Sequence, residues 1–108
     1  MLYRDRLIEL SERSLTIKHY YFPLATAKIV PLNDIVRVQA FKPGFTHGRF
    51  RLWGTGAPDV WFACDWRRPA RDCLFRVRLR SQRIEPAFSA ERPEQLKSIL
   101  AARGLLAT

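Results

Sequence analysis

The amino-acid sequence predicts a mainly β fold: about seven antiparallel strands in a β-barrel or sandwich, followed by one C-terminal α-helix. Short segments of alternating apolar and polar residues recur between turn residues, a pattern typical of sandwiches and barrels. The seven Phe, three Trp and three Tyr also favour strands. Near the C-terminus the apolar spacing lengthens to that of a helix. With 108 residues, we expect a single domain covering residues 1–108.

Alternation predicts each strand in turn. The expected strands and short extended segments cover residues 6–11, 15–22, 28–32, 35–41, 49–53, 60–65, 74–80 and 83–88. Glycine and proline indicate loops at 42–48, 54–59 and 66–72. Pro23 ends the second strand, because proline cannot donate a hydrogen bond to a sheet. Asn33 and Asp34 supply a turn.

The strands also predict which side chains share a face, because successive residues of a strand point to opposite sides. Within 15–22 we expect His19 beside Leu15 and Ile17, and within 35–41 we expect Val36 beside Val38. The clearest strand is 74–80. Its apolar face holds Phe75, Val77 and Leu79, and its opposite face holds Arg76, Arg78 and Arg80.

The C-terminal helix begins at Pro93, which suits the first turn because its missing N–H has no partner there. Glu94 complements the positive end of the helix dipole, and Gly104 is the expected stop. A narrow stripe on one side consists of Leu96, Ile99, Leu100 and Arg103. A helix of about three turns is marginal alone, so this stripe must pack on the sheet.

The formal net charge of +9 is concentrated in residues 37–83, which hold eleven basic and three acidic side chains. The candidate anion-binding residues are Arg49 and Arg51 on one strand, Arg67, Arg68 and Arg71 in a loop, and Arg76, Arg78 and Arg80 on another strand. If they converge, their planar guanidinium groups suit phosphate or carboxylate, and Trp53, Trp61 and Trp66 could stack beside them. They can equally form the solvated face of an ordinary sheet, and the sequence leaves both interpretations open.

Three segments together resemble the bacterial pleckstrin-homology-like domains. The first is YYFP at 20–23 followed by KIVPLNDI at 28–35, the second is RLWG at 51–54, and the third runs from 83 to 96 into the helix. The resemblance implies two nearly orthogonal antiparallel sheets in a partly open barrel, with the helix plugging one end. It also implies a binding or assembly module without catalysis.

The chain departs from that family pattern at two places. Arg92 stands where an acidic residue usually precedes the helix-starting proline, which leaves Ser89 or Glu91 as alternative N-caps. The region of the first hairpin offers only Arg13 and Lys18, so specific phosphoinositide recognition does not carry over.

No catalytic residue, metal site or cofactor is expected. His19 and His47 have no nucleophile signature beside them. Together with Cys64 and Cys73 they could total four zinc ligands, but zinc modules keep paired ligands about two to four residues apart. Cys64 alternates in phase with residues 60 and 62, which indicates a core cysteine.

We therefore expect a non-catalytic protein-binding or self-assembly module, in which an open sheet edge pairs with an extended segment. The alternative is an arginine-rich polyanion-binding domain for an anionic membrane surface or nucleic acid. No small-molecule substrate is implied. The N-terminal residues read directly into a folded segment, no apolar run approaches the roughly 20 residues of a membrane span, and two cysteines are few for a secreted scaffold. We expect a cytoplasmic location.

Overall fold

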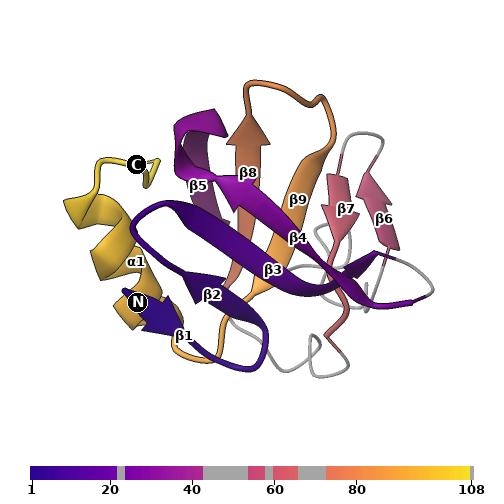
Figure 1. Ribbon diagram of the computed structural model, residues 1–108, viewed down its shortest axis with the longest axis horizontal. Coiled ribbons are helices and arrows are strands. Elements are labelled where there is room, and N and C mark those ends of the chain that lie inside the picture. Colours follow the sequence, from indigo (N-terminus) through magenta and orange to yellow (C-terminus); the bar gives the residue numbers. More distant parts are fainter. Residues whose placement is uncertain (22–23, 43–53, 58–59, 66–72, 108) are drawn as a thin grey trace.

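Two β-sheets cross one another, and a single helix lies at one end of them (Figure 1). The computed structural model describes residues 1–21, 24–42, 54–57, 60–65 and 73–107, with the backbone alone for 54–57. The predicted mainly β fold with one C-terminal helix is confirmed. Within the described residues the strands form two separate sheets and no closed barrel.

The first sheet has four antiparallel strands in the order of the chain. They are β1 (Tyr3–Arg4), β2 (Ile8–Leu10), β3 (Ser14–Tyr21) and β4 (Thr26–Pro31). β1 was not expected from the sequence, and β2 is shorter than the predicted 6–11. Alternation places the side chains of Ile8, Leu15 and Val30 in the core, where each is at most 1% exposed. The 3-10 turn η1 (Leu32–Asp34) then leads from β4 into the second sheet.

The second sheet is mixed, and its strand order is β5-β8-β9-β7-β6. These strands are β5 (Ile35–Phe41), β6 (Gly54–Ala57), β7 (Val60–Phe62), β8 (Leu74–Leu79) and β9 (Glu85–Ser89). β7 and β9 pair in parallel, so the prediction of a purely antiparallel fold was wrong. The prediction of a loop at 54–59 was also wrong for residues 54–57. Residues 54–57 are held as β6 by pairing with β7, a tertiary contact that outweighs the low strand propensity of glycine. The strand expected at 49–53 lies outside the described residues.

Two β-bulges overturn the predicted faces of β3 and β5. In β3, Ile17 lies opposite Lys28, and Tyr21 lies opposite Thr26. More residues therefore separate these two pairs on β3 than on β4. His19 has a φ of 55° at this bulge and is exposed, instead of sharing the face of Ile17. A similar shift follows Ile35 in β5, where Val36 is exposed while Val38 is buried. Bulges change the direction in which later side chains point.

The helix α1 (Pro93–Ala102) closes the end of the sheets beside β1 (Figure 1). Leu96 and Leu100 are at most 2% exposed and join the core shared by both sheets, as the stripe predicted. Neither Ser89 nor Glu91 caps the helix: the N-cap residue is Arg92, without a side-chain capping bond.

The helix ends at Ala102, and Gly104 follows its C-cap residue Arg103 with a φ of 71°, the left-handed conformation that glycine adopts without strain. The chain then returns to the outer edge of β5. There the N–H of Val38 donates to the carbonyl of Leu105 at 2.7 Å, and the N–H of Ala107 donates to the carbonyl of Val38 at 2.8 Å. The C-terminal residues thereby cover part of this sheet edge.

Candidate functional site

Three of the eight arginines singled out in the sequence belong to the described residues, and two of these lie together. Arg49, Arg51, Arg67, Arg68 and Arg71 lie outside the described residues, as do His47, Trp53 and Trp66. Among the others, Arg76 and Arg78 project from the outer face of β8, opposite the buried Phe75 and Val77. The predicted alternation of this strand is therefore confirmed.

Arg80 follows β8 and is held at the corner between the sheets. Its Nε donates to the carbonyl of Asn33 at 3.2 Å, and its backbone N–H donates to the carbonyl of Asp34 at 2.8 Å. Its place in the set is taken by Arg37 of β5, which lies directly opposite Arg78 in the sheet. The antiparallel register of β5 on β8 creates this pair, and the sequence alone did not show it.

Arg37, Arg76 and Arg78, together with Gln39 and Glu85, line a hollow of about 80 Å³ that we call the arginine surface. The Nε of Arg76 lies 2.8 Å from a carboxylate oxygen of Glu85. Arg37 and Arg78 make no ion pair with any described residue. Two guanidinium groups here are therefore free of such a partner, as a polyanion site requires.

A larger hollow of about 680 Å³ opens where the two sheets meet. We call it the aromatic groove; it is lined by Tyr20, Tyr21, Lys28, Trp61, Gln82, Arg83 and Ile84. The bulge at His19 builds one wall, because it buries Tyr20 and leaves Tyr21 at the surface. The ring centroids of the two tyrosines are 5.0 Å apart in an edge-on arrangement. Trp61 donates its Nε1–H to the carbonyl of Tyr20 at 2.9 Å, which fixes the indole.

Lys28 is the most unusual side chain of this groove. It is 8% exposed, although lysine is almost never fully buried unless it is paired. Its Nζ donates to the Tyr21 hydroxyl at 3.3 Å and lies 5.5 and 5.6 Å from the ring centroids of Tyr20 and Tyr21. Burial also raises the pKa of the Tyr20 hydroxyl, with Tyr21 adding to the shift.

A second hollow of about 390 Å³, which we call the β4 groove, continues from the first along β4 to Leu79 and Asn33. Lys28 and Gln82 line both hollows. β4 is the edge of its sheet, and no described strand pairs with its outer side. Together the hollows run beside an open strand edge.

The direction of the β4 backbone groups follows from one hydrogen bond. The N–H of Leu32 donates to the carbonyl of Arg13 at 2.9 Å, and antiparallel pairs alternate between bonded and non-bonded. Lys28 and Val30 therefore bond to β3, whereas Ile29, opposite Thr16, directs its N–H and C=O outward. Pro31 occupies the next outward position, where a missing N–H costs no bond to β3.

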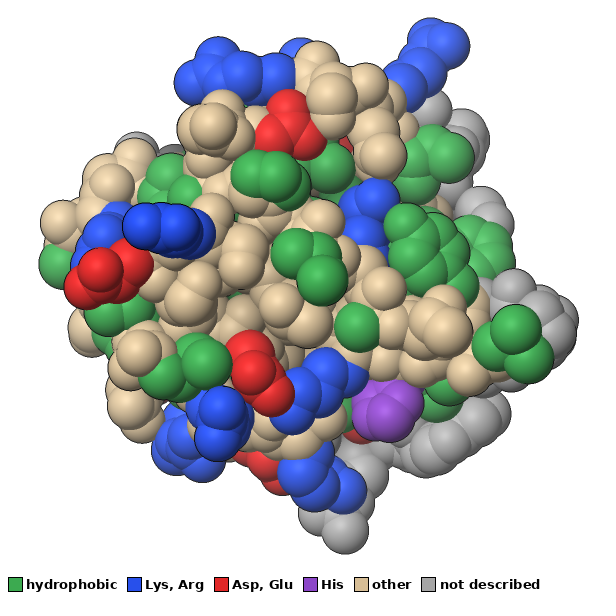
Figure 2. Space-filling view, in the orientation of Figure 1, with side chains coloured by type: hydrophobic (Ala, Val, Ile, Leu, Met, Phe, Trp, Pro, Cys, Tyr) green, Lys and Arg blue, Asp and Glu red, His purple; other side chains and the backbone are tan. Residues whose placement is uncertain are grey.

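Several large apolar side chains are exposed in or near these hollows. Tyr21, Ile29 and Ile84 line them and Leu24 lies in the turn before β4, and each is between 46% and 82% exposed. Figure 2 shows groups of hydrophobic side chains on the face that carries β3 and β4. Large exposed apolar side chains in one region are typical of an interaction surface.

Among the described residues, the cysteines and His19 form no metal site. No group of three or more His, Cys, Asp or Glu suited to a metal occurs among the described residues. Cys64 is half-buried, and Ala63 takes the buried position beside Phe62, so the prediction of a core cysteine at 64 was wrong. The strand ends at Phe62, so the alternation of buried and exposed residues does not continue to residue 64. Cys73 is a half-buried free thiol whose pKa is raised by burial.

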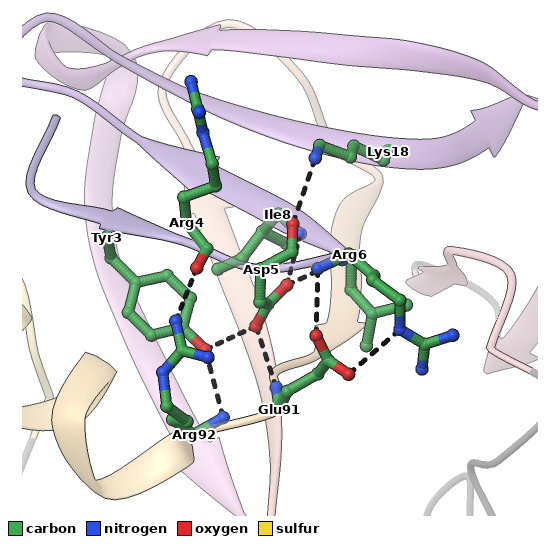
Figure 3. A network of polar contacts seen from close by, with 9 residues as sticks. Tyr3, Arg4, Asp5, Arg6, Ile8, Lys18, Glu91 and Arg92 are labelled. Atoms are coloured by element: carbon green, nitrogen blue, oxygen red, sulfur yellow. Dashed lines mark hydrogen bonds and ion pairs between the residues drawn. The ribbon is translucent and has the colours of Figure 1, made fainter.

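A polar network joins the N-terminus to the start of α1 (Figure 3). The buried carboxylate of Asp5 accepts the N–H groups of Leu7 at 2.6 Å, Ile8 at 2.9 Å and Glu91 at 2.8 Å. It also accepts a hydrogen bond from the Tyr3 hydroxyl. The sequence analysis did not single out Asp5; its position two residues after a buried tyrosine carried no functional signal. All these bonds join groups of the protein to one another, so the network is structural.

The described part of the chain contains no helix that is long and apolar enough to cross a membrane. The chain matches no family model, and no curated protein or solved structure is detectably similar to it. The candidate function therefore depends on the surfaces described above.

Proposed function

We propose that this chain is a non-catalytic binding module of pleckstrin-homology-like fold that holds an extended segment of another protein, a second copy included, along β4. The observation that carries the proposal is the open edge of β4 beside two continuous hollows. The other sheet offers a less open edge at β5, because residues 105–107 already bond to Val38. An unpaired edge binds an added strand through main-chain hydrogen bonds, and adjacent pockets select its side chains.

The absence of catalysis is part of the same proposal. The buried carboxylate of Asp5 accepts hydrogen bonds from three backbone amides and a phenol. It holds the fold together and has no free position for a substrate. His19 is exposed on the outside of a bulge, where its backbone carbonyl accepts the N–H of Cys64.

The edge is tested by the substitution Ile29→Pro. The Ile29 N–H faces outward, so proline removes a donor for an added strand without removing a bond to β3. Size-exclusion chromatography with light scattering, at low and high salt, measures self-assembly. Selection of random 12-residue peptides displayed on phage measures binding of an external segment.

We expect either a salt-resistant oligomer or enriched peptides, and we expect Ile29→Pro to abolish whichever is seen. Val36→Pro, on β5, is the matched control at an exposed valine of the other sheet, next to its bulge. A monomer that enriches no peptide, or binding that survives Ile29→Pro, would overturn the proposal.

Polyanion binding at the arginine surface is a second candidate function. Arg37 and Arg78 lie opposite one another without an ion pair to any described residue, an arrangement that a bound anion would relieve. The probes are a fluorescent 20-nucleotide oligothymidine and vesicles containing phosphatidylserine. Binding should fall steeply with salt and disappear in an Arg37→Gln/Arg78→Gln variant. Salt-independent binding, or none, contradicts this candidate, and Ile29→Pro should not affect it.

A further inference from the structure

Lys28 is a buried cation without a carboxylate partner among the described residues. No Asp or Glu oxygen of those residues lies within 4.0 Å of its Nζ. Within the same part of the chain its polar contact is one hydrogen bond, donated to the Tyr21 hydroxyl, which uses one of three ammonium protons. Burying a charge is costly unless it is paired and hydrogen-bonded. The two tyrosine rings offset part of that cost.

The described lining of the aromatic groove around Lys28 has one sign of charge. The seven described residues that line it include two cations, Lys28 and Arg83, and no Asp or Glu. The rest of the lining is aromatic, aliphatic or amide. Such a site complements an anionic group attached to an apolar one.

The position of Lys28 connects the groove to the strand edge. Lys28 belongs to β4 and lines both hollows, so an extended segment lying along β4 passes its ammonium group. The neighbouring residue Ile29 supplies the outward N–H and C=O that such a segment would bond. A cation and a backbone template therefore lie side by side.

We propose that Lys28 binds the carboxylate of an acidic side chain in the partner segment, and that an apolar side chain next to it fills the aromatic groove. This inference rests on the proposed function and names the chemistry of the segment. An acidic peptide is favoured over a membrane surface, because the open backbone of β4 pairs only with another backbone. A lipid surface would instead meet the cations of the arginine surface, which shares no described lining residue with either groove.

The test uses the phage-selected peptides and two variants of the full chain. The enriched sequences should contain Asp or Glu next to an aromatic or large aliphatic residue. For a synthetic copy of the best peptide, Lys28→Met should weaken binding at least about tenfold, because a charge-assisted hydrogen bond is lost. Replacing the acidic residue of the peptide with its amide should have the same effect on the wild type and none on Lys28→Met.

Arg78→Met is the matched control, since it removes one positive charge from the arginine surface instead. It should leave the affinity within about twofold, which separates a specific contact from attraction to a chain of net charge +9. Equal losses in Lys28→Met and Arg78→Met would overturn the inference. Peptides that bind along β4 without an acidic residue would also overturn it but leave the proposed function standing. Failure to enrich any peptide, in a chain that also stays monomeric, would remove both.

Discussion

Asp5 and Lys28 are two charged side chains buried to the same extent, each 8% exposed, and their surroundings differ completely. The Asp5 carboxylate accepts four hydrogen bonds from the N-terminal turn and the start of α1 (Figure 3). Among the described residues, the Lys28 ammonium donates one hydrogen bond, to a tyrosine hydroxyl, and lies near two aromatic rings. One buried charge is fully compensated by the fold, and the other is not.

The difference separates structure from function. A saturated buried charge ties distant segments together: Asp5 and Glu91 are 86 residues apart in the chain. An under-compensated one raises the free energy of the empty fold and can be relieved by a ligand of opposite sign. We therefore expect Asp5 variants to change stability, and Lys28 variants to change binding.

The largest effect is expected for Asp5→Ala. It leaves the buried N–H groups of Leu7, Ile8 and Glu91 without their acceptor, which should lower the free energy of unfolding by about 3 kcal/mol or more. Urea denaturation followed by tryptophan fluorescence measures the loss. The control Arg6→Ala breaks only an exposed ion pair with Glu91 and should cost less than about 1 kcal/mol. Equal losses would contradict a structural role for the carboxylate.

Tyr3 makes the same network sensitive to alkaline pH. Burial, together with the hydrogen bond to Asp5, raises the pKa of its hydroxyl from 10.0 to about 12. The unfolded chain releases this proton near pH 10 and the folded chain near pH 12. The contribution to stability is therefore complete below pH 10 and is lost as the pH rises to 12, by about 3 kcal/mol at about 1.4 kcal/mol per pKa unit. The advantage of the wild type over Tyr3→Phe in urea should shrink over this range; an advantage that stays constant would contradict the shift.

His19→Val tests the bulge that forms the wall of the aromatic groove. A β-branched residue is strongly disfavoured at a φ of 55°, so the substitution should cost about 1 kcal/mol. It should also change the fluorescence of Trp61, because the bulge directs Tyr20 toward that indole, 6.4 Å away between ring centroids. Asparagine tolerates this backbone conformation, so His19→Asn should change little. Equal stability of the two variants would show that the bulge does not depend on residue 19.

Local patterns predicted much of this fold correctly. The bounds of β5 and the alternation of β8 follow from local sequence patterns, as do the start of α1 at Pro93 and the left-handed Gly104 that follows its C-cap. Each depends on interactions between near neighbours in the chain. The parallel pairing of β7 with β9 could not be predicted in this way, because it joins residues about 25 apart through tertiary packing.

The candidate site was harder to predict than the fold. The bulges at His19 and after Ile35 change the phase of their strands without a glycine or proline to signal it. From the sequence alone, a lysine at position 28 is expected to be exposed to solvent. Its burial becomes visible only in the packed structure. Arg76 and Arg78 were identified from alternation, whereas Arg37 joins them only through the pairing of β5 with β8. Surfaces built from several strands depend on register, which one sequence does not reveal.

The smallest change in stability is expected for Lys28→Met, and it is the sharpest test of the comparison. Methionine keeps most of the apolar stem and removes a buried charge that has no carboxylate partner among the described residues. Replacing a poorly compensated buried ion by an apolar side chain of similar volume is often neutral or stabilising. We therefore expect a free energy of unfolding unchanged, or higher by about 1 kcal/mol, in the same urea titration used for Asp5→Ala. A loss above about 2 kcal/mol would mean that Lys28 supports the fold as Asp5 does, and the aromatic groove would then be a structural site.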